Sequence, residues 1–359
     1  MSRTTRKALI AEIEQKRKSR LLCYLTSDRQ NAVGQIAKDA IPLFFKHLNL
    51  FEDHTQVDVL VCTLGGDTLA AFGLSRLIRE FTKNVRVLVP EKCHSGGTLF
   101  ALGANEILMT KAGTLSPIDP SITSPLNPAI ELMPGQRQLL PVSVESVAGF
   151  KALIEEDWGI KSEEHLIAGV KMLADRVHPL ALGDVFRSRQ QIQRFARVLL
   201  ASHRTDKKRI DQIIKTLVAE LGSHDYLISR QEARKLFGRQ IAGDSKENKE
   251  TEDLTWSIYE DFAAEMELGV EYNPQAVLHS AQATSPGAVT SVILRLAAIE
   301  SLARSDFFEQ EFNLSSVQTM TPAGLATGIQ QQLVRSGWRT YPFLPCTNRT
   351  FEPNAVMKS

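Results

Sequence analysis

The chain has 359 residues, of which 43% are hydrophobic and 23% charged, a composition typical of a soluble globular protein with a sizeable core. Its formal charge of +1 gives no overall attraction to nucleic acid or to a membrane surface, so neither partner is expected. The sequence lacks an apolar run of about 18 residues, so no membrane span is predicted.

The N-terminal segment, residues 1–20, is rich in Lys, Arg and Glu and predicts a basic helix, exposed to solvent or in contact with another subunit. It lacks the apolar core and cleavage site of a secretory signal. Cys23, Cys62, Cys93 and Cys346 lie far apart, without the close spacing of a zinc site or a disulfide framework, so no metal is expected. Two of them lie in apolar runs, which fits reduced thiols in a cytoplasmic protein.

Short apolar runs alternate with helical patterns from residue 21 to about residue 110. Compact apolar runs are typical of strands that are buried on both faces, and their alternation with helices predicts a mostly parallel α/β sheet with right-handed crossovers. The expected strands are Leu21–Leu25, Val57–Cys62, Val85–Val89 and Glu106–Met109, and the expected helices are Ile36–Leu48, Leu69–Phe81 and Ser95–Gly103.

The second half of the chain is less regular. Residues 114–142 are rich in proline and predict an extended loop. Helical patterns at 143–157, 162–177, 184–203 and 206–221 form an expected helical insertion within a domain of residues 21–242. The polar run 243–253 predicts a linker to a C-terminal α+β module of residues 254–359. Within that module, Val292–Leu296 and Phe307–Phe312 indicate strands, whereas 297–304 also fits a helix.

A pair of glycines, Gly65 and Gly66, follows the second strand, and Asp67 is placed to cap the next helix. The phosphate-binding patterns GxGxxG and GxxxxGK[ST] are absent, which argues against a nucleotide cofactor and an intrinsic ATPase. The remaining functional interpretation is that this turn donates a backbone N–H to a carbonyl oxygen.

Ser95 follows the next strand and precedes Gly96 and Gly97, which is half of the GxSxG turn that exposes a serine nucleophile. Neighbouring parallel strands end at one crevice, so the two glycine turns are expected to lie together there. In that arrangement Ser95 is the candidate nucleophile, and the N–H groups of Gly65 or Gly66 and of Gly96 are the candidate oxyanion hole.

A serine nucleophile also requires a base and a group that orients the base. His94 is a poor candidate because adjacent side chains diverge, whereas His224 lies in a loop before a helix. Asp119, flanked by two prolines, and Lys151, on the helix after the proline-rich loop, are further candidates.

Taken together, these motifs and the segments Ala104–Met109 and Leu115–Pro120 resemble the ClpP/crotonase-like superfamily, and within it the serine dehydrogenase proteinase family, over about residues 18–240. The segment Leu227–Ala233 is also similar to the part of ClpP that follows its catalytic aspartate. The resemblance implies a spiral of ββα units with Ser95 as nucleophile.

The same resemblance implies the residue order Ser, Asp, His, which corresponds here to Ser95, Asp119 and His224. The ClpP histidine position falls near Asp119, where this chain has no histidine, and the ClpP aspartate position falls on Asp225. Two alternatives therefore stay open: Asp225 as the orienting acid, and a dyad of Ser95 with Lys151 as in relatives of signal peptide peptidase A.

The function that these features imply is that of a cytoplasmic, ATP-independent serine peptidase without a cofactor. It is expected to cleave peptides or unfolded proteins through an acyl-enzyme and to form a homo-oligomer. A non-catalytic scaffold with the same fold is one alternative. A crotonase-like acyl-CoA enzyme, which would use the oxyanion glycines without Ser95, is another.

Overall fold

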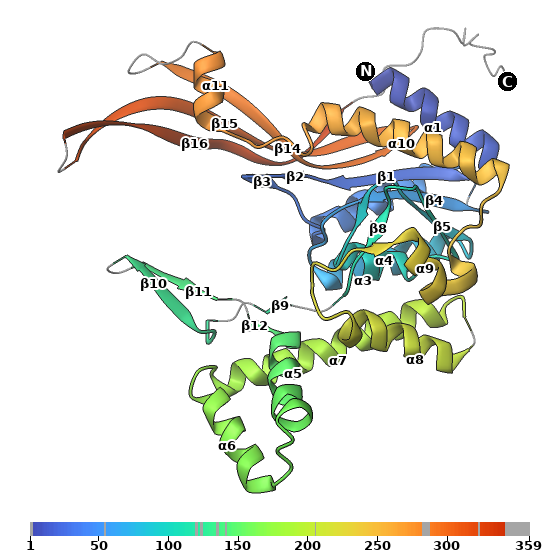
Figure 1. Ribbon diagram of the computed structural model, residues 1–359. Helices are drawn as coiled ribbons and strands as arrows, with labels where there is room; N and C mark the ends of the chain where they lie inside the picture. Colours follow the sequence, from blue (N-terminus) through green and yellow to red (C-terminus); the bar gives the residue numbers. More distant parts are fainter. Residues whose placement is uncertain are drawn as a thin grey trace, which may run out of the picture.

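The computed structural model describes residues 3–53, 55–118, 121–122, 125–133, 136–140, 142–204, 206–281, 288–321 and 324–341 (Figure 1). The strands are β1 (Arg20–Thr26), β2 (Asp28–Arg29), β3 (Ala32–Val33), β4 (Val57–Cys62), β5 (Val85–Val89), β6 (Lys92–Cys93), β7 (Glu106–Met109), β8 (Thr114–Leu115), β9 (Ser121–Ile122), β10 (Ala129–Met133), β11 (Gln136–Leu139), β12 (Val142–Ser143), β13 (Ile228–Ser229), β14 (Val289–Ser301), β15 (Arg304–Thr321) and β16 (Gly324–Tyr341).

The α-helices are α1 (Arg3–Arg17), α2 (Ile41–Asn49), α3 (Thr68–Phe81), α4 (Gly96–Ala101), α5 (Val144–Ala152), α6 (Glu163–Ala174), α7 (Pro179–Ala201), α8 (Lys207–Lys215), α9 (Arg230–Phe237), α10 (Lys246–Met266) and α11 (Pro274–Ser280). Short 3-10 helices lie at Lys38–Ala40 and Gly238–Gln240. Short π-helices, at Leu153–Asp157 and Thr216–Glu220, follow α5 and α8.

A 7-stranded sheet in the order β16-β15-β14-β1-β4-β5-β7 forms the centre of the molecule. Strands β1, β4, β5 and β7 are parallel, and their pairing register aligns Leu22 with Val59 and Val59 with Val87. All six residues of β4 are buried, as the compact apolar run predicts. The predicted mixed α/β fold with a parallel core sheet is therefore confirmed.

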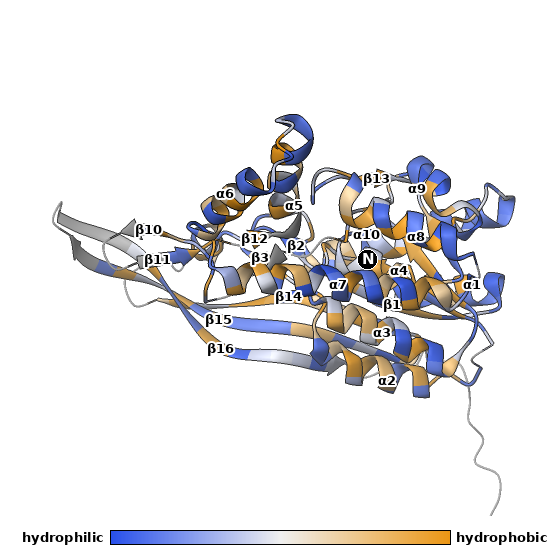
Figure 2. Cartoon of the chain, turned by 90° about the horizontal axis from the view of Figure 1, so that it is seen from below, coloured by the Kyte–Doolittle hydropathy of each residue, from blue (hydrophilic) through white to orange (hydrophobic). Residues whose placement is uncertain are grey.

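Helices cover both faces of this sheet, because alternate strand residues point to opposite sides. Leu22, Val59 and Val87 pack on one face with residues of α2, α3 and α7. Cys23 and Leu60, each next in sequence to one of these, pack on the other face with α1 and α10. Figure 1 shows the three layers, and in Figure 2, a view from below, α2 and α3 carry both hydrophobic and hydrophilic residues. The buried thiols Cys23, Cys62 and Cys93 are free.

The basic N-terminal segment is a helix, as predicted, but α1 is not simply a solvated surface helix. Ile10 and Ile13 are fully buried against α10 and the sheet. The buried guanidinium of Arg6 donates to Asp261 Oδ1 at 2.7 Å and to Glu300 Oε2 at 2.8 Å. Carboxylates from two distant segments, which the local composition does not reveal, therefore hold this cationic helix in place.

The C-terminal part differs most from the sequence-based expectation. Helix α10 takes up most of the predicted linker, because its buried face, which includes Thr251, Ile258 and Phe262, packs against the core. Residues 297–304 contain no helix: β14 pairs antiparallel with β1, and a tight turn leads into β15. Strands β15 and β16, of 18 residues each, form a long hairpin that extends past the body of the molecule, with α11 packed on it (Figure 1).

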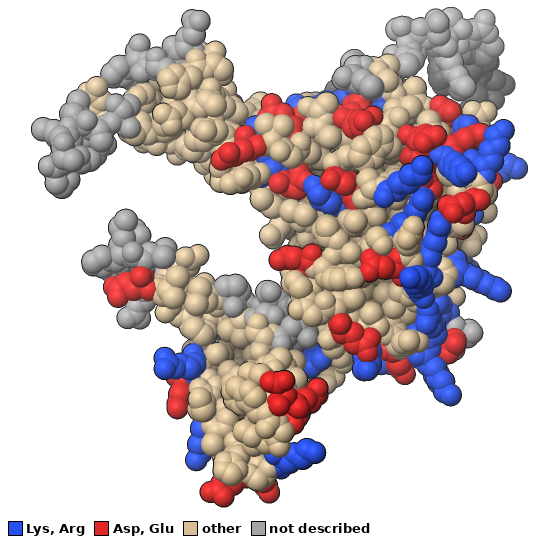
Figure 3. Space-filling view, in the orientation of Figure 1, with Lys and Arg blue, Asp and Glu red and all other residues tan. Residues whose placement is uncertain are grey.

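The predicted helical insertion is present as α5 to α8, and the loop before it contains the short strands β8 to β12. Helices α5 and α6 form an arm at one end of α7, whose other end packs on α3. Phe195 of α7 stacks on Phe72 of α3, with 4.2 Å between ring centroids. The space-filling view is hollowed between this arm and the β14–β16 arm (Figure 3). Strand β1 runs from the end of α1 towards β2 and β3, so the carboxyl ends of the parallel strands lie on the side from which both arms project (Figure 1).

Candidate active site

The two glycine turns meet at the carboxyl ends of β4 and β5. A parallel bridge joins Thr63 to Cys93. Two backbone hydrogen bonds flank it, from the Thr63 N–H to the Lys92 carbonyl at 2.8 Å and from the His94 N–H to the Thr63 carbonyl at 3.0 Å. The two turns therefore lie close together, as expected. Their proximity results from the Thr63–Cys93 bridge, which extends the parallel pairing beyond the regular β4–β5 ladder.

Gly65 touches the turn that carries the candidate nucleophile. With φ at 114°, it has a backbone conformation that favours glycine. A Cβ on this residue would lie 2.8 Å from Ser95 Cβ and 3.0 Å from the His94 carbonyl oxygen. Any side chain here would displace Ser95, so the close approach of the two turns requires a glycine at this position.

The hydrogen bonds of the backbone amides distinguish Gly65 from Gly66, which the sequence leaves open as alternative oxyanion donors. The Gly65 N–H donates to Thr63 Oγ1 at 3.0 Å, and that hydroxyl also bonds Thr26 Oγ1 at 2.7 Å. In the described part of the chain, no hydrogen bond uses the N–H of Gly66 or of Gly96. Both groups lie close together, since a Cβ on Gly96 would be 3.3 Å from the Gly66 nitrogen. The available pair of donors is thus Gly66 and Gly96.

Ser95 has an unusual backbone conformation, with φ at 48° and ψ at −112°. It directly precedes α4, yet its side chain does not cap that helix, so the hydroxyl is not committed to the usual role of a serine at this position. Positive φ at a non-glycine residue costs on the order of 1–3 kcal/mol and is frequent at functional sites. The conformation matches the strained strand-to-helix turn of a serine nucleophile.

Buried hydroxyls hold this turn, and the sequence interpretation did not identify them. The Ser95 N–H donates to Ser116 Oγ at 2.7 Å, and Ser116 Oγ donates to the Pro117 carbonyl at 3.0 Å. The Ser116 N–H donates to Thr98 Oγ1 at 3.0 Å, and Thr98 Oγ1 donates to the Cys93 carbonyl at 2.7 Å. The sequence signal that could have identified these hydroxyl residues is their position as polar residues in otherwise apolar runs beside the glycine turns.

His224 lies in an exposed loop, and a small sheet connects the segment after this loop to the site. Strand β13, four residues after His224, pairs with β8, and β8 pairs with β6 next to Ser95. Asp225 shares the loop, and its N–H donates to Ser223 Oγ at 3.2 Å. The sheet order β13-β8-β6 brings the His224 segment beside the segments of Ser116 and Ser95.

His94 has a different role from that of a base. Its Nε2 is 2.8 Å from Thr114 Oγ1. Burial, the main cause, and the charge of Lys92 lower the pKa of His94 to about 4. The charges of His224 and Asp225 also act on His94, which indicates that their loop lies nearby. A ring with so low a pKa is a weak proton acceptor at neutral pH.

The other two predicted residues do not join the site in the described structure. Asp119 lies outside the described residues. Lys151 lies on α5 in the helical arm, 73% exposed, with its Nζ 3.7 Å from Glu155 Oε2. The structure therefore brings together the two glycine turns, Ser95 and the loop of His224.

Within the described residues, no group of three or more His, Cys, Asp or Glu side chains is arranged to hold a metal ion. None of the helices in those ranges combines the length and the apolar character needed to cross a lipid bilayer.

Comparison with known proteins gives a family match for the first part of the chain. Residues 1–138 match the family model of the ClpP-like SDH-type serine proteinases, which confirms the resemblance predicted from the motifs. The matched region contains both glycine turns, Ser95 and Ser116.

Two curated relatives come from Methanocaldococcus jannaschii. The uncharacterized protein MJ0137 is 27% identical over 181 residues, which are 50% of this chain and 51% of the relative. The uncharacterized protein MJ1495 is 29% identical over 124 residues, 32% of this chain and 41% of the relative. The match therefore spans about half or less of the length of these relatives.

Among solved structures, two mutants of the 1510-N membrane-bound stomatin-specific protease are similar to this chain. One has a TM-score of 0.37 and 14% identity and covers 61% of this chain and 80% of the mutant chain. The other, in complex with a substrate peptide, has a TM-score of 0.36 and 14% identity over 61% and 75% of the two chains.

Proposed function

We propose that the protein is a serine peptidase that acts through an acyl-enzyme on Ser95. The observation that carries the proposal is the position of Ser95 in a strained turn beside two unused amides, those of Gly66 and Gly96. The family match of residues 1–138 supports the same chemistry.

In the proposed first step, Ser95 Oγ attacks the carbonyl carbon of a peptide bond while His224 accepts the hydroxyl proton. The N–H groups of Gly66 and Gly96 stabilise the negative oxygen of the tetrahedral intermediate. His224 then gives its proton to the leaving amine as the C–N bond breaks, and an ester on Ser95 remains. His224 next takes a proton from a water that attacks the ester carbon, and gives it to Ser95 Oγ as the ester C–O bond breaks. The acid product leaves and the free serine is restored.

The group that orients His224 is proposed to be Asp119 or, as an alternative, Asp225, its neighbour in the exposed loop. Lys151 is the alternative base. In the described chain it is paired with Glu155 on the helical arm, so the dyad would need a movement of this arm or a lysine from a second copy.

The proposed substrates are peptides or unfolded segments, since both arms project from the side on which the carboxyl ends of the parallel strands lie (Figure 1). The absence of the nucleotide-binding glycine motifs supports an activity independent of ATP. Three buried free thiols support a reducing compartment, the cytoplasm. Assembly into a homo-oligomer is part of the same proposal.

A fluorophosphonate probe tests this function, because it reacts covalently with an activated serine. The wild-type protein is expected to be labelled, and the Ser95→Ala variant is expected to show no labelling. Ser202→Ala, at the end of α7, is a matched control that keeps Ser95. A wild-type protein that is folded but resists labelling would favour the scaffold, and turnover of an acyl-CoA by Ser95→Ala would favour the crotonase-like enzyme.

A further inference from the structure

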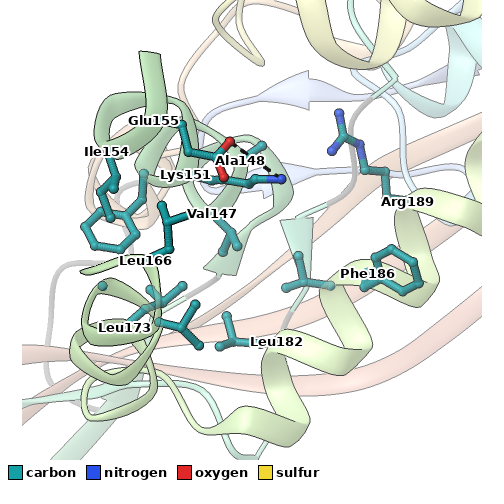
Figure 4. Close-up of a pocket in the computed structure, with 14 residues that line it drawn as sticks. Val147, Ala148, Lys151, Ile154, Glu155, Leu166, Leu173, Leu182, Phe186 and Arg189 are labelled. Carbon is teal, nitrogen blue, oxygen red and sulfur yellow. Dashed lines mark ion pairs between the residues drawn. The ribbon is translucent and has the colours of Figure 1, made fainter. Parts of the chain in front are cut away.

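The helical arm contains an apolar pocket of about 440 Å³ that the proposed reaction of Ser95 with His224 does not use (Figure 4). Residues of α5, the following π-helix, α6 and α7 line it, and its volume lies in the range of sites for small ligands and short peptide segments. Most of its wall is aliphatic or aromatic, including Val147, Leu166, Val170, Leu173 and Phe186.

The wall of the pocket has a specific local geometry. The residues that follow α5, Leu153–Asp157, form a π-helix, a rare conformation that is frequent at functional sites. Gly169 lets α6 approach this segment, since a Cβ at that position would lie 2.6 Å from Ile154 Cδ1. Val170 and Phe186 remain 63% and 62% exposed at the pocket, so the protein leaves apolar surface uncovered here.

Three charged residues line the pocket, and only one of them lacks a counter-charge among the described residues. Lys151 pairs with Glu155, as the dashed line in Figure 4 shows. Arg189 of α7 stands near Phe186 and has its Nε buried, and the described residues supply no hydrogen-bond partner for that atom. A guanidinium beside an apolar wall suits an apolar ligand that ends in a carboxylate, which can accept two parallel N–H bonds.

We propose that this pocket binds the free carboxyl end of a peptide, with the last apolar side chains against α5 and α6 and the terminal carboxylate on Arg189. Helix α7 runs from the pocket into the core, where Phe195 stacks on Phe72 of α3. Helix α3 begins directly after Gly66 and its capping residue Asp67. A rigid helix thus connects the pocket to the element that carries one oxyanion turn, so a bound chain end is held on the same body as Ser95.

The inference that the bound peptide is a substrate rests on the proposed peptidase function. The inference that the pocket binds the peptide does not. The experiment therefore uses the full chain with Ser95→Ala, which cannot form the acyl-enzyme. The probe is a fluorescein-labelled peptide ending in Leu-Phe, prepared with either a free carboxylate or a carboxamide at its C-terminus. Fluorescence anisotropy gives the two dissociation constants.

The acid is expected to bind at least about tenfold more tightly than the amide, because only the acid can pair with Arg189. Arg189→Gln is expected to remove this difference by weakening the acid alone. Val170→Asp, in the pocket wall, is expected to weaken both peptides by about tenfold. Met172→Asp, 66% exposed on the same helix but outside the pocket lining, is the matched control and is expected to change neither.

Equal affinity for acid and amide, unchanged by Arg189→Gln, would overturn the proposal. Arg189-dependent binding of decanoate without binding of the peptide would replace the peptide with a fatty acid. A change in mass by sedimentation on Val170→Asp, with peptide affinity unchanged, would identify a second copy of the chain as the occupant. Fluorophosphonate labelling of wild-type protein tests the catalytic proposal separately, so the two failures are distinguishable.

Discussion

Ser95 and His224 lie in segments that the protein holds in different ways. The turn of Ser95 is fixed by a sheet bridge, by the contact with Gly65 and by the hydroxyl of Ser116. The loop of His224 is exposed and is anchored through β13, four residues farther along. The proposed nucleophile and the proposed oxyanion donors thus lie in preorganised turns, whereas the proposed base lies on the more accessible loop.

The largest expected effect comes from the exposed loop. His224→Ala should slow fluorophosphonate labelling by at least about a thousandfold, because Ser95 loses its proton acceptor. His165→Ala, an exposed histidine on the arm, is the control and should leave the rate unchanged. Labelling of His224→Ala at the wild-type rate would mean that another residue is the base. In that case Lys151→Ala would be expected to lose the labelling.

The next effect tests the rigid turn. Gly65→Ala should lower the labelling rate by about a hundredfold or more, because the new Cβ would press on Ser95 Cβ and shift the oxyanion donors. Gly183→Ala makes a comparable change in α7, where the new Cβ would have no atom within 4 Å apart from its chain neighbours and the backbone of its own helix, and should have almost no effect. Equal rates for the two variants would show that the close packing of the glycine turns is not needed for reactivity.

Ser116→Ala should have a smaller effect, a loss of about tenfold in kcat with KM nearly unchanged. The substitution removes the acceptor of the partly buried Ser95 N–H, which costs about 1 kcal/mol, and relaxes the strained turn. Ser162→Ala, which removes the cap of α6, should affect stability without changing kcat. If Ser116→Ala lost as much stability as Ser162→Ala and kept full kcat, Ser116 would have only a structural role.

The smallest expected effect concerns pH. Burial lowers the pKa of His94 to about 4, so its neutral form is favoured in the folded protein. This contribution to stability is complete above the unfolded pKa of about 6.5 and is lost as the pH falls towards 4. His94→Gln should therefore lose less stability between pH 7.5 and pH 5 than the wild type, by on the order of 1 kcal/mol in urea unfolding. Equal losses of stability in the wild type and in His94→Gln would contradict the lowered pKa of His94.

The sequence predicted the parts of the molecule in which local pattern and burial agree. The apolar runs of β1, β4, β5 and β7 are buried on both faces, and the glycines at two strand ends predicted that their turns lie together, as Gly65 and Ser95 do. Which of Gly65 and Gly66 has its N–H engaged was not predictable, because this depends on the hydroxyl of Thr63, which accepts the Gly65 N–H.

The C-terminal strands were harder to predict for a related reason. Strand β14 shows mixed burial along its length, from exposed at Val289 to fully buried at Ser301, so no single periodicity marks it. Its pairing with β1 joins residues that are more than 250 positions apart in sequence, as in Cys23 with Glu300. Neither local propensity nor spacing carries that information.

The buried guanidinium of Arg6 has a consequence for how this protein is made. Its partners, Asp261 and Glu300, follow the parallel core in the chain, and a buried charge without a partner costs several kcal/mol. During synthesis, α1 and the outer edge of β1 therefore lack their final contacts until β14 has left the ribosome. A truncated chain that ends after α9 should accordingly fold poorly, even though it contains the whole segment that matches the proteinase family.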